Sequence, residues 1–250
     1  MRSSWTRRRA AALVIPALAF VVGAALVFVT PTSTVRAAGA DLETVDPAEV
    51  GLSSERLERL DAGMQAMVDE GKLAGVVTLL ARHGKVAFVD VAGVQDIESQ
   101  RPMARDSIFR IFSMTKPITG VAMMMLYEEG KWRLNDPASR YIPSFAGLKV
   151  HTGENADGSM KLEDADHQIT MRELMTHTAG LGYVLNQRHP VNQRFMEERV
   201  LNPMAPLQVM IDKMANIPLL AQPGTRWIYS SAVDVQGYLV EQFSGQPFAA

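Results

Sequence analysis

Ser113 and Lys116 are the two side chains in this sequence whose types and spacing best suit nucleophilic chemistry. They stand three residues apart, and residues at that spacing share one face of a helix. Pro117 directly after them favours a first helical turn at this point. The positive end of the helix dipole stabilises an oxyanion that develops next to a serine at the helix N-terminus. A lysine one turn further on can take the proton of the serine hydroxyl. The same spacing is also typical of a capping serine beside a solvated lysine, so the pair alone leaves both interpretations open.

Tyr229 is the second candidate for chemistry. It follows the turn-forming pair Pro223-Gly224 and stands just before a helix that we expect to open with a capping box at Ser231–Asp234. A tyrosine hydroxyl close to a lysine can act first as a base and then as an acid toward a leaving group. The alternative is a tyrosine that anchors its loop by packing.

The five histidines show no H-E-x-x-H or comparable ligand spacing, so the sequence predicts no metal site. His177 would be the natural base of a Ser-His-Asp arrangement. However, Ser113 lacks the G-x-S-x-G surroundings that are typical of such a serine. We therefore interpret His177 as a capping or packing group at the end of a short helix.

The elements that must position these residues are short and of mixed type. Apolar spacing predicts a helix over 57–71, and the next segment is predicted as a strand, a tight turn at Arg82–Lys85 and a second strand. A Met-rich helix follows Lys116, residues 131–168 are mostly loop-like, and a capping box at Thr170–Glu173 opens a further helix. Because one hairpin does not make a stable sheet, we expect that strands which would complete it are missing from this sequence.

Composition and charge exclude several classes of protein. The chain has 250 residues, 47% of them hydrophobic and 21% charged, which is ordinary globular composition. The absence of cysteine excludes disulfides, thiolate metal sites and cysteine nucleophiles. Outside residues 1–40, which hold five arginines and no acidic group, 20 basic residues face 27 acidic ones. That net charge of −7 argues against a nucleic-acid-binding surface.

The first forty residues are predicted to be an export signal. Arg7–Arg9 precede an apolar run over 10–29, and Ala37–Ala40 supply the small residues of a cleavage site. We expect cleavage near Ala40. The alternative is an uncleaved membrane tether through residues 10–29, since about twenty apolar residues can span a bilayer. Under both interpretations residues 41–250 form one domain outside the cytoplasm, either periplasmic or extracellular.

Taken together, three stretches resemble the serine β-lactamase and penicillin-binding-protein superfamily, in particular its class C-like branch with the family VIII carboxylesterases. They are Phe109–Lys116, Leu174–Leu181 and Pro223–Ser230. These stretches come in the family's order, and the resemblance covers nearly all of residues 46–250. The fold it implies is α+β, an α/β sandwich of the β-lactamase and transpeptidase type. The antiparallel sheet is incomplete in this chain, and a mostly helical subdomain accompanies it.

The same resemblance implies roles for the candidate residues. Ser113 would be the nucleophile that forms an acyl-enzyme, Lys116 the general base, and Tyr229 its partner in proton transfer. The main-chain N–H of Ser113 would supply half of an oxyanion hole, and no cofactor is implied. The expected function is cleavage of small-molecule carboxylic esters. The alternatives are a β-lactamase or D,D-carboxypeptidase acting on an amide by the same mechanism, and a non-catalytic envelope binding module.

Two departures from the family pattern bear on this expectation. The β-lactamases of this branch have Tyr-x-Asn, whereas here Ser231 replaces the Asn that helps to hold the side-chain amide of a β-lactam. This replacement favours simple esters. In addition, no third motif of the Lys/His-x-Gly or Trp-x-Gly type follows Tyr229. We therefore expect an N-terminal fragment that lacks the strand carrying the second oxyanion N–H.

Overall fold

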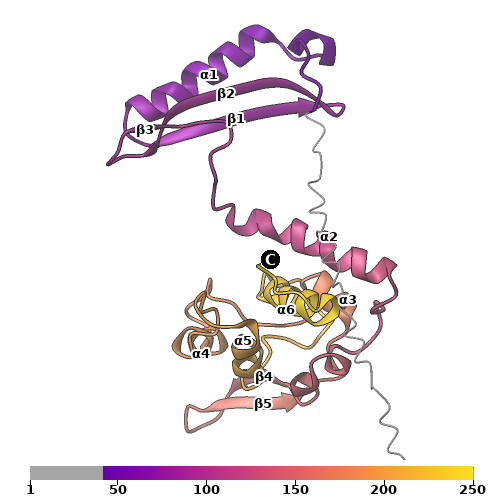
Figure 1. Cartoon of the computed structure of the whole chain (residues 1–250). Helices are drawn as coiled ribbons and strands as arrows, with labels where there is room; N and C mark the ends of the chain where they lie inside the picture. The colour runs from indigo at the N-terminus through magenta and orange to yellow at the C-terminus, as the bar shows by residue number, and fades with distance from the viewer. Residues whose placement is uncertain (1–41, 250) are drawn as a thin grey trace, which may run out of the picture. The chain divides into compact units, whose positions relative to one another are not determined.

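A computed structural model of the chain describes residues 42–249. The predicted signal or tether in residues 1–40 lies outside the described residues. Within residues 42–249 no helix has the length and apolar character needed to cross a membrane. The described chain divides into two compact units, residues 42–107 and residues 108–249 (Figure 1).

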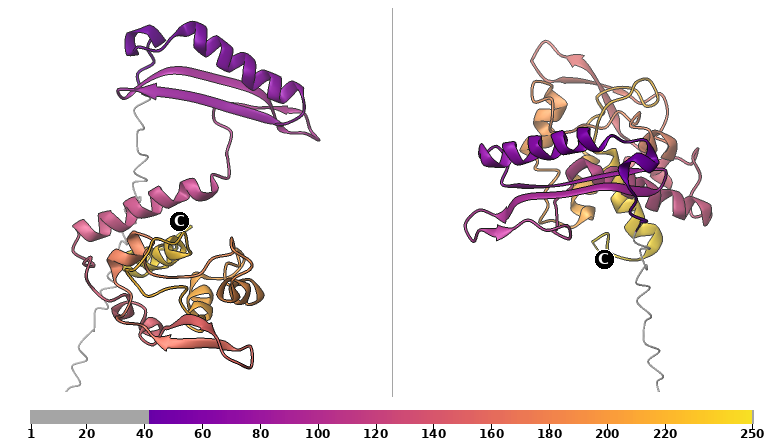
Figure 2. Two further views of the ribbon diagram at one scale, coloured as in Figure 1. Left: turned by 180° about the vertical axis from the view of Figure 1, so that it is seen from behind. Right: turned by 90° about the horizontal axis from the view of Figure 1, so that it is seen from above.

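The first unit is a helix on a small antiparallel sheet with strand order β1-β2-β3. Its elements are η1 (Pro47–Val50), α1 (Ser54–Asp69), β1 (Gly75–Arg82), β2 (Lys85–Asp96) and β3 (Arg101–Pro102). Helix α1 lies along one face of the sheet (Figures 1 and 2). His83 and Gly84, with φ of 54° and 74°, form the left-handed pair that a two-residue type I′ hairpin turn requires. The predicted helix and hairpin are confirmed.

The second unit is mostly helical and contains all three predicted catalytic residues. Its elements are η2 (Phe112–Met114), α2 (Thr115–Glu128), η3 (Ala138–Arg140), η4 (Pro143–Phe145), β4 (Lys149–Glu154), β5 (Met160–Asp164), α3 (Met171–Met175), α4 (Pro190–Glu197), α5 (Leu207–Met214) and α6 (Ala232–Ser244). Helix α6 is central, because α2, α3 and α5 all contact it. Met123, Leu174 and Leu239 are fully buried in the core that these helices share. Helices with small antiparallel sheets agree with the predicted α+β class.

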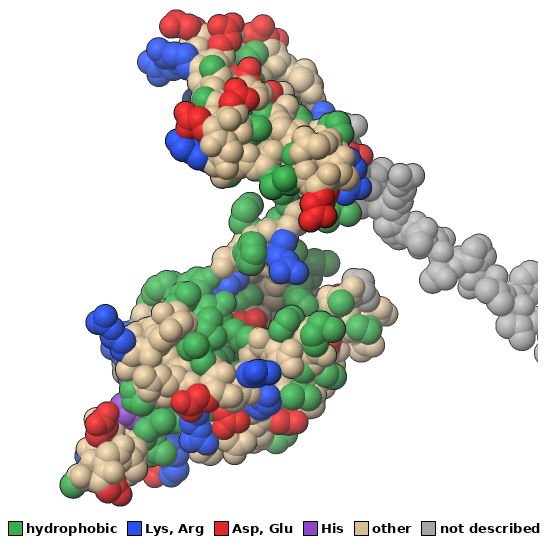
Figure 3. All heavy atoms as spheres, turned by 90° about the vertical axis from the view of Figure 1, so that its left-hand side faces the viewer, with side chains coloured by type: hydrophobic (Ala, Val, Ile, Leu, Met, Phe, Trp, Pro, Cys, Tyr) green, Lys and Arg blue, Asp and Glu red, His purple; other side chains and the backbone are tan. Residues whose placement is uncertain are grey.

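Helix α2 carries apolar side chains on more than one face. Met123 and Leu126 are buried in the core of the unit. Ile118, Val121 and Met125 lie three to four residues apart and are exposed. Figure 3 shows hydrophobic side chains gathered on the surface of this unit. Within the second unit, α2 is therefore anchored by one face, the one that meets α6.

The prediction of mostly loop over residues 131–168 is wrong for β4 and β5, which form an antiparallel hairpin. Most side chains of this hairpin are exposed, so it shows no regular alternation of apolar and polar residues. Val150 is an exception and is buried. Leu219 joins the hairpin through its main chain, donating to the Lys149 carbonyl at 2.7 Å and accepting from His151 N–H at 2.9 Å.

Candidate active site

Ser113 lies where the chain enters α2. Phe112 before it has φ of 45°, a left-handed conformation that is uncommon for a residue other than glycine. The Thr115 N–H donates to the Phe112 carbonyl, so the chain makes a tight 3-10 turn before the α-helix begins. This turn leaves the Ser113 side chain exposed at the helix N-terminus. Backbone strain beside such a residue is typical of functional sites.

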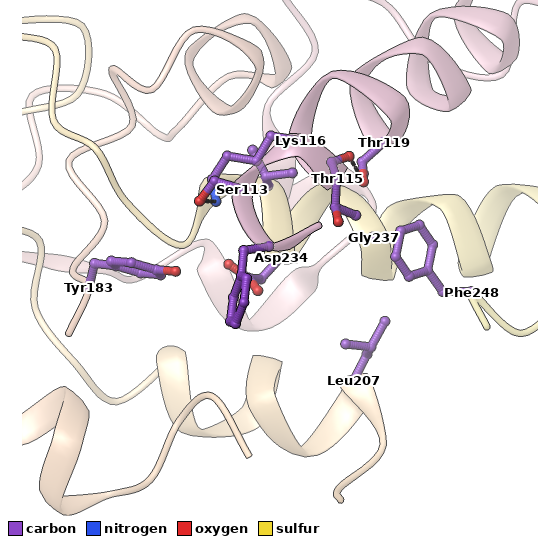
Figure 4. A pocket seen from close by; sticks show the side chains of 11 residues that line it. Ser113, Thr115, Lys116, Thr119, Tyr183, Leu207, Asp234, Gly237 and Phe248 are labelled. Carbon is purple, nitrogen blue, oxygen red and sulfur yellow. Dashed lines mark hydrogen bonds between the residues drawn. The ribbon is translucent and has the colours of Figure 1, made fainter. Parts of the chain in front are cut away.

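The structure brings the three predicted side chains together. Ser113 Oγ and Tyr229 Oη lie 2.5 Å apart, and Lys116 Nζ donates to Ser113 Oγ at 3.3 Å. Lys116 Nζ also lies 4.8 Å from the centre of the Tyr229 ring. Figure 4 shows Ser113 and Lys116 side by side at the start of α2 with the hydrogen bond between them. The Ser113 hydroxyl therefore has two neighbours able to exchange its proton.

The electrostatic environment of Tyr229 suits proton transfer. Hydrogen bonding with the Lys116 ammonium is the largest influence, and it lowers the pKa of the Tyr229 phenol below its ordinary value. The hydrogen bond with Ser113 acts in the same direction, while burial opposes both. A phenol with a lowered pKa exchanges protons more readily near neutral pH.

Helix α3 holds the loop that carries Tyr229. Its predicted capping box is confirmed: Glu173 N–H donates to Thr170 Oγ1 at 3.3 Å, and Thr170 N–H donates to Glu173 Oε2 at 2.7 Å. In the loop, Gly224 N–H donates to the Thr178 carbonyl at 2.8 Å. Gly224 has φ of 78°, and a Cβ there would lie 2.8 Å from Glu173 Oε1. Glycine is therefore the residue that fits against α3 at this turn.

A pocket of about 310 Å³ opens beside Ser113 and Lys116 (Figure 4). Its apolar wall includes Phe112, Leu207, Val233 and Phe248. Asp234 of α6 and Tyr183 add polar atoms to the lining. An apolar pocket with a few polar groups next to a nucleophile is suited to a small organic substrate.

Asp234 and Tyr183 line this pocket and were not predicted from the sequence. Burial raises the pKa of the Asp234 carboxyl, and the charge of Lys116 opposes that shift. Burial likewise raises the pKa of Tyr183, whose ring centre lies 5.9 Å from Lys116 Nζ. Nothing in the spacing marks either residue, because Asp234 stands where a helix-opening acid is expected and Tyr183 lies in a loop.

Ser231 has a different role from the one predicted at the start of α6. Its side chain makes no cap hydrogen bond to the first turn of the helix, so the predicted capping box at Ser231–Asp234 is wrong. Instead Ser231 is fully buried, and its Oγ donates to the Gly182 carbonyl at 2.9 Å. Its N–H donates to the same carbonyl at 3.2 Å. The hydroxyl is thus committed to the main chain and is not directed at a substrate.

The histidines are not arranged around a metal. In the described part of the chain, no group of three or more His, Asp or Glu side chains is placed to hold a metal ion. His177 bonds to the loop of Tyr229: its Nδ1 accepts the Ser230 N–H at 3.3 Å.

Comparison with known proteins relates the chain to one family. Residues 60–250 match the family model described as Beta-lactamase. The chain is 36% identical to esterase EstB of Burkholderia gladioli over 210 residues, which are 83% of this chain and 50% of that protein. The chain spans about half the length of the curated relatives it matches.

Two solved structures resemble the fold. EstCE1, described as a hydrolase with promiscuous acyltransferase activity, superposes with a TM-score of 0.63 and 33% identity over 77% of this chain and 48% of its own. Unliganded simvastatin synthase LovD from Aspergillus terreus has the same TM-score of 0.63, with 25% identity over 78% of this chain and 50% of its own.

Proposed function

This chain belongs to the beta-lactamase family, and from that premise we propose that it is an exported serine hydrolase that cleaves carboxylic esters through acyl-Ser113. One observation carries the proposal: the Ser113 hydroxyl is hydrogen-bonded to both Lys116 Nζ and Tyr229 Oη. A serine is a weak nucleophile until an adjacent group accepts its proton, and here two such groups adjoin it.

Acylation follows from this arrangement. Ser113 Oγ attacks the ester carbonyl carbon while its proton passes to Lys116 as the neutral amine, or to Tyr229 as the phenolate. The carbonyl π pair moves to the oxygen, and the main-chain N–H of Ser113, in the turn just before α2, would stabilise the charge. Tyr229 then protonates the alcohol oxygen as the C–O bond breaks. The alcohol leaves, and the acyl group remains on Ser113.

Deacylation uses the same groups in reverse. Tyr229 takes a proton from a water molecule that attacks the acyl carbonyl, and the proton returns to Ser113 Oγ when the acid is released. An alcohol in place of water would give a transesterification. The names of EstCE1 and LovD, a hydrolase with acyltransferase activity and a synthase, support this second outcome of one acyl-enzyme.

The substrate class follows from Ser231 and from the relatives. With the Ser231 hydroxyl bonded to the Gly182 carbonyl, the site lacks the amide group that β-lactamases of this branch use at this position. The similarity to esterase EstB points the same way. We therefore propose ester substrates ahead of β-lactams or peptides.

Export is proposed from the N-terminal sequence. Arginines at the start, an apolar run over 10–29 and Ala37–Ala40 support a signal or a tether. N-terminal sequencing of the protein recovered from the cell envelope tests it: a start near residue 41 supports cleavage, and recovery from the cytoplasm alone contradicts export.

The nucleophile is tested by intact-mass analysis after exposure to a p-nitrophenyl phosphonate. We expect one adduct on the full chain, lost in Ser113→Ala and strongly reduced in Lys116→Ala. Ser159→Ala, a matched change in the exposed hairpin turn, should keep the adduct. Labelling that survives Ser113→Ala would overturn the proposed nucleophile, and a folded chain that takes no label would favour a binding module.

A further inference from the structure

His177 has a backbone conformation that marks it among the residues near the site. Its φ is 57°, and a left-handed non-glycine residue persists only where its surroundings determine it. It directly follows Thr176, the C-cap of α3, and the next residue is tied back to the helix by the hydrogen bond from Thr178 N–H to the Glu173 carbonyl at 3.0 Å. The position of His177 is thus fixed by the turn that ends α3.

His177 bonds to the residues on both sides of Tyr229. Its carbonyl accepts Ile228 N–H at 2.8 Å, and its Nδ1 accepts Ser230 N–H at 3.3 Å. Ser230 is buried, and its Oγ also lies 3.3 Å from Nδ1. Tyr229 therefore stands between two anchor points that belong to one residue.

The imidazole also stacks on the phenol ring. The two ring centres are 5.4 Å apart with an interplanar angle of 10°. The Trp227 ring meets the His177 ring edge-on at 5.8 Å. Tyr229 is thereby restrained by its main chain and by its ring, while its hydroxyl lies 2.5 Å from Ser113 Oγ.

This arrangement requires a neutral imidazole. Nδ1 can accept a main-chain N–H only when it carries no proton itself. Burial lowers the pKa of His177, and the charge of Lys116 lowers it further, so the neutral form is favoured. Protonation of His177 Nδ1 would place two N–H donors opposite each other, that of the imidazole and that of Ser230. It would also add a positive charge near Lys116.

We propose that His177 is a positioning residue that holds the Tyr229 hydroxyl at Ser113 through its stacked ring and its two hydrogen bonds to residues 228 and 230. The inference rests on the proposed function, in which Tyr229 exchanges protons with Ser113. It gives the capping or packing group expected from the sequence a specific role, because its hydrogen bonds lie on both sides of Tyr229 and its ring stacks on the Tyr229 ring.

A double-mutant cycle in the full chain tests the proposal, with the rate of phosphonate labelling at Ser113 as the readout. His177→Ala should slow labelling by about tenfold to a hundredfold, since a misplacement of about 1 Å costs that much. In a Tyr229→Phe background the same change should matter by no more than about twofold, because the residue through which it acts is already disabled. An equal loss in both backgrounds, or no loss in the first, would overturn the proposal.

Two further variants separate positioning from folding. His177→Asn keeps an acceptor near the position of Nδ1 and is a residue type that tolerates left-handed backbone, so it should recover most of the lost rate. His189→Ala is the matched control. It removes a comparable histidine acceptor, which binds Val191 N–H at 3.3 Å at the start of α4, and it should leave labelling unchanged. A His177→Asn variant as slow as His177→Ala would contradict the role of Nδ1.

A measurement that needs no catalysis distinguishes failure of this inference from failure of the proposed function. The ultraviolet titration of wild type minus that of Tyr229→Phe isolates the tyrosine whose pKa is lowered by Lys116 and Ser113. In His177→Ala this titration should move up toward the ordinary tyrosine value of about 10. An unchanged titration contradicts the positioning role even if Ser113 proves not to react.

Discussion

At the scale of single residues, the proposed mechanism divides the reaction among Ser113, Lys116 and Tyr229, and it makes the contribution of Tyr229 depend on pH. Tyr229→Phe should lower kcat for ester hydrolysis by about 10²–10⁴-fold, the usual contribution of a positioned acid or base. The pKa of Tyr229 is lowered by Lys116 first and by Ser113 next. A group acting as a base is active above its pKa, so kcat should rise with pH through a value below that of an ordinary tyrosine. A pH profile of kcat measures this rise.

Tyr183→Phe is the matched control for that profile. Burial raises the pKa of Tyr183, the opposite direction from Tyr229, although both rings adjoin Lys116. The rise of kcat with pH should therefore persist in Tyr183→Phe and be lost in Tyr229→Phe. A rise that persists in both variants would assign it to a different group.

At the scale of elements, the contact between α3 and the Tyr229 loop predicts a functional effect for a glycine outside the pocket lining. Gly224→Ala places a Cβ 2.8 Å from Glu173 Oε1 in a residue with φ of 78°. The left-handed conformation alone should cost about 1–2 kcal/mol of stability. The clash should also shift the loop and slow phosphonate labelling of Ser113. Thermal unfolding and the labelling rate measure the two effects.

Gly158→Ala separates strain from contact. Gly158 has nearly the same conformation, with φ of 81°, but a Cβ there would meet nothing within 4 Å. It should lose about the same 1–2 kcal/mol of stability for its left-handed backbone and keep the wild-type labelling rate. Equal labelling rates in the two variants would show that the Gly224 contact does not position Tyr229.

The elements also show which parts of the structure local sequence can reveal. Helix α1, the β1–β2 hairpin and the cap of α3 depend on nearby residues, and their periodicity, turn pair and capping box predicted them. The β4–β5 hairpin is largely exposed, so it carries no regular apolar pattern and was missed.

The residues of the site likewise divide into those that local sequence can predict and those that it cannot. Ser113 and Lys116 share one turn, so their spacing was informative. Tyr229 is 116 residues from Ser113 in the sequence, so no local pattern relates the two residues. Only the family resemblance predicted that Tyr229 acts with Ser113 and Lys116. Asp234 enters the site through the packing of α6 against α2, which no local pattern encodes.

At the scale of the whole molecule, Asp136 makes stability depend on pH. Its Oδ2 accepts the Tyr141 hydroxyl at 2.5 Å, and this hydrogen bond is the main reason that the Asp136 pKa lies below its ordinary value of 3.8. A carboxyl with a lowered folded-state pKa adds stability above its unfolded value and loses it as pH falls through the folded one. Tyr141→Phe should therefore cost about 2 kcal/mol at pH 7, the usual value for a hydrogen bond to a charged group. Urea unfolding at a series of pH values should show that difference shrinking below pH 3.8.

Tyr238 offers the comparison that isolates the charge of Asp136 from the loss of a hydroxyl. The Tyr238 hydroxyl donates to Gln208 Oε1 at 2.7 Å, and this acceptor has no charge to lose in acid. Tyr238→Phe should therefore cost about 1 kcal/mol at every pH in the acid range. If the cost of Tyr141→Phe were equally constant, the bond would not be charge-assisted and Asp136 would not govern acid stability. If the cost of Tyr141→Phe decreases in acid while the cost of Tyr238→Phe stays constant, the Tyr141 hydroxyl stabilises the ionised carboxylate of Asp136.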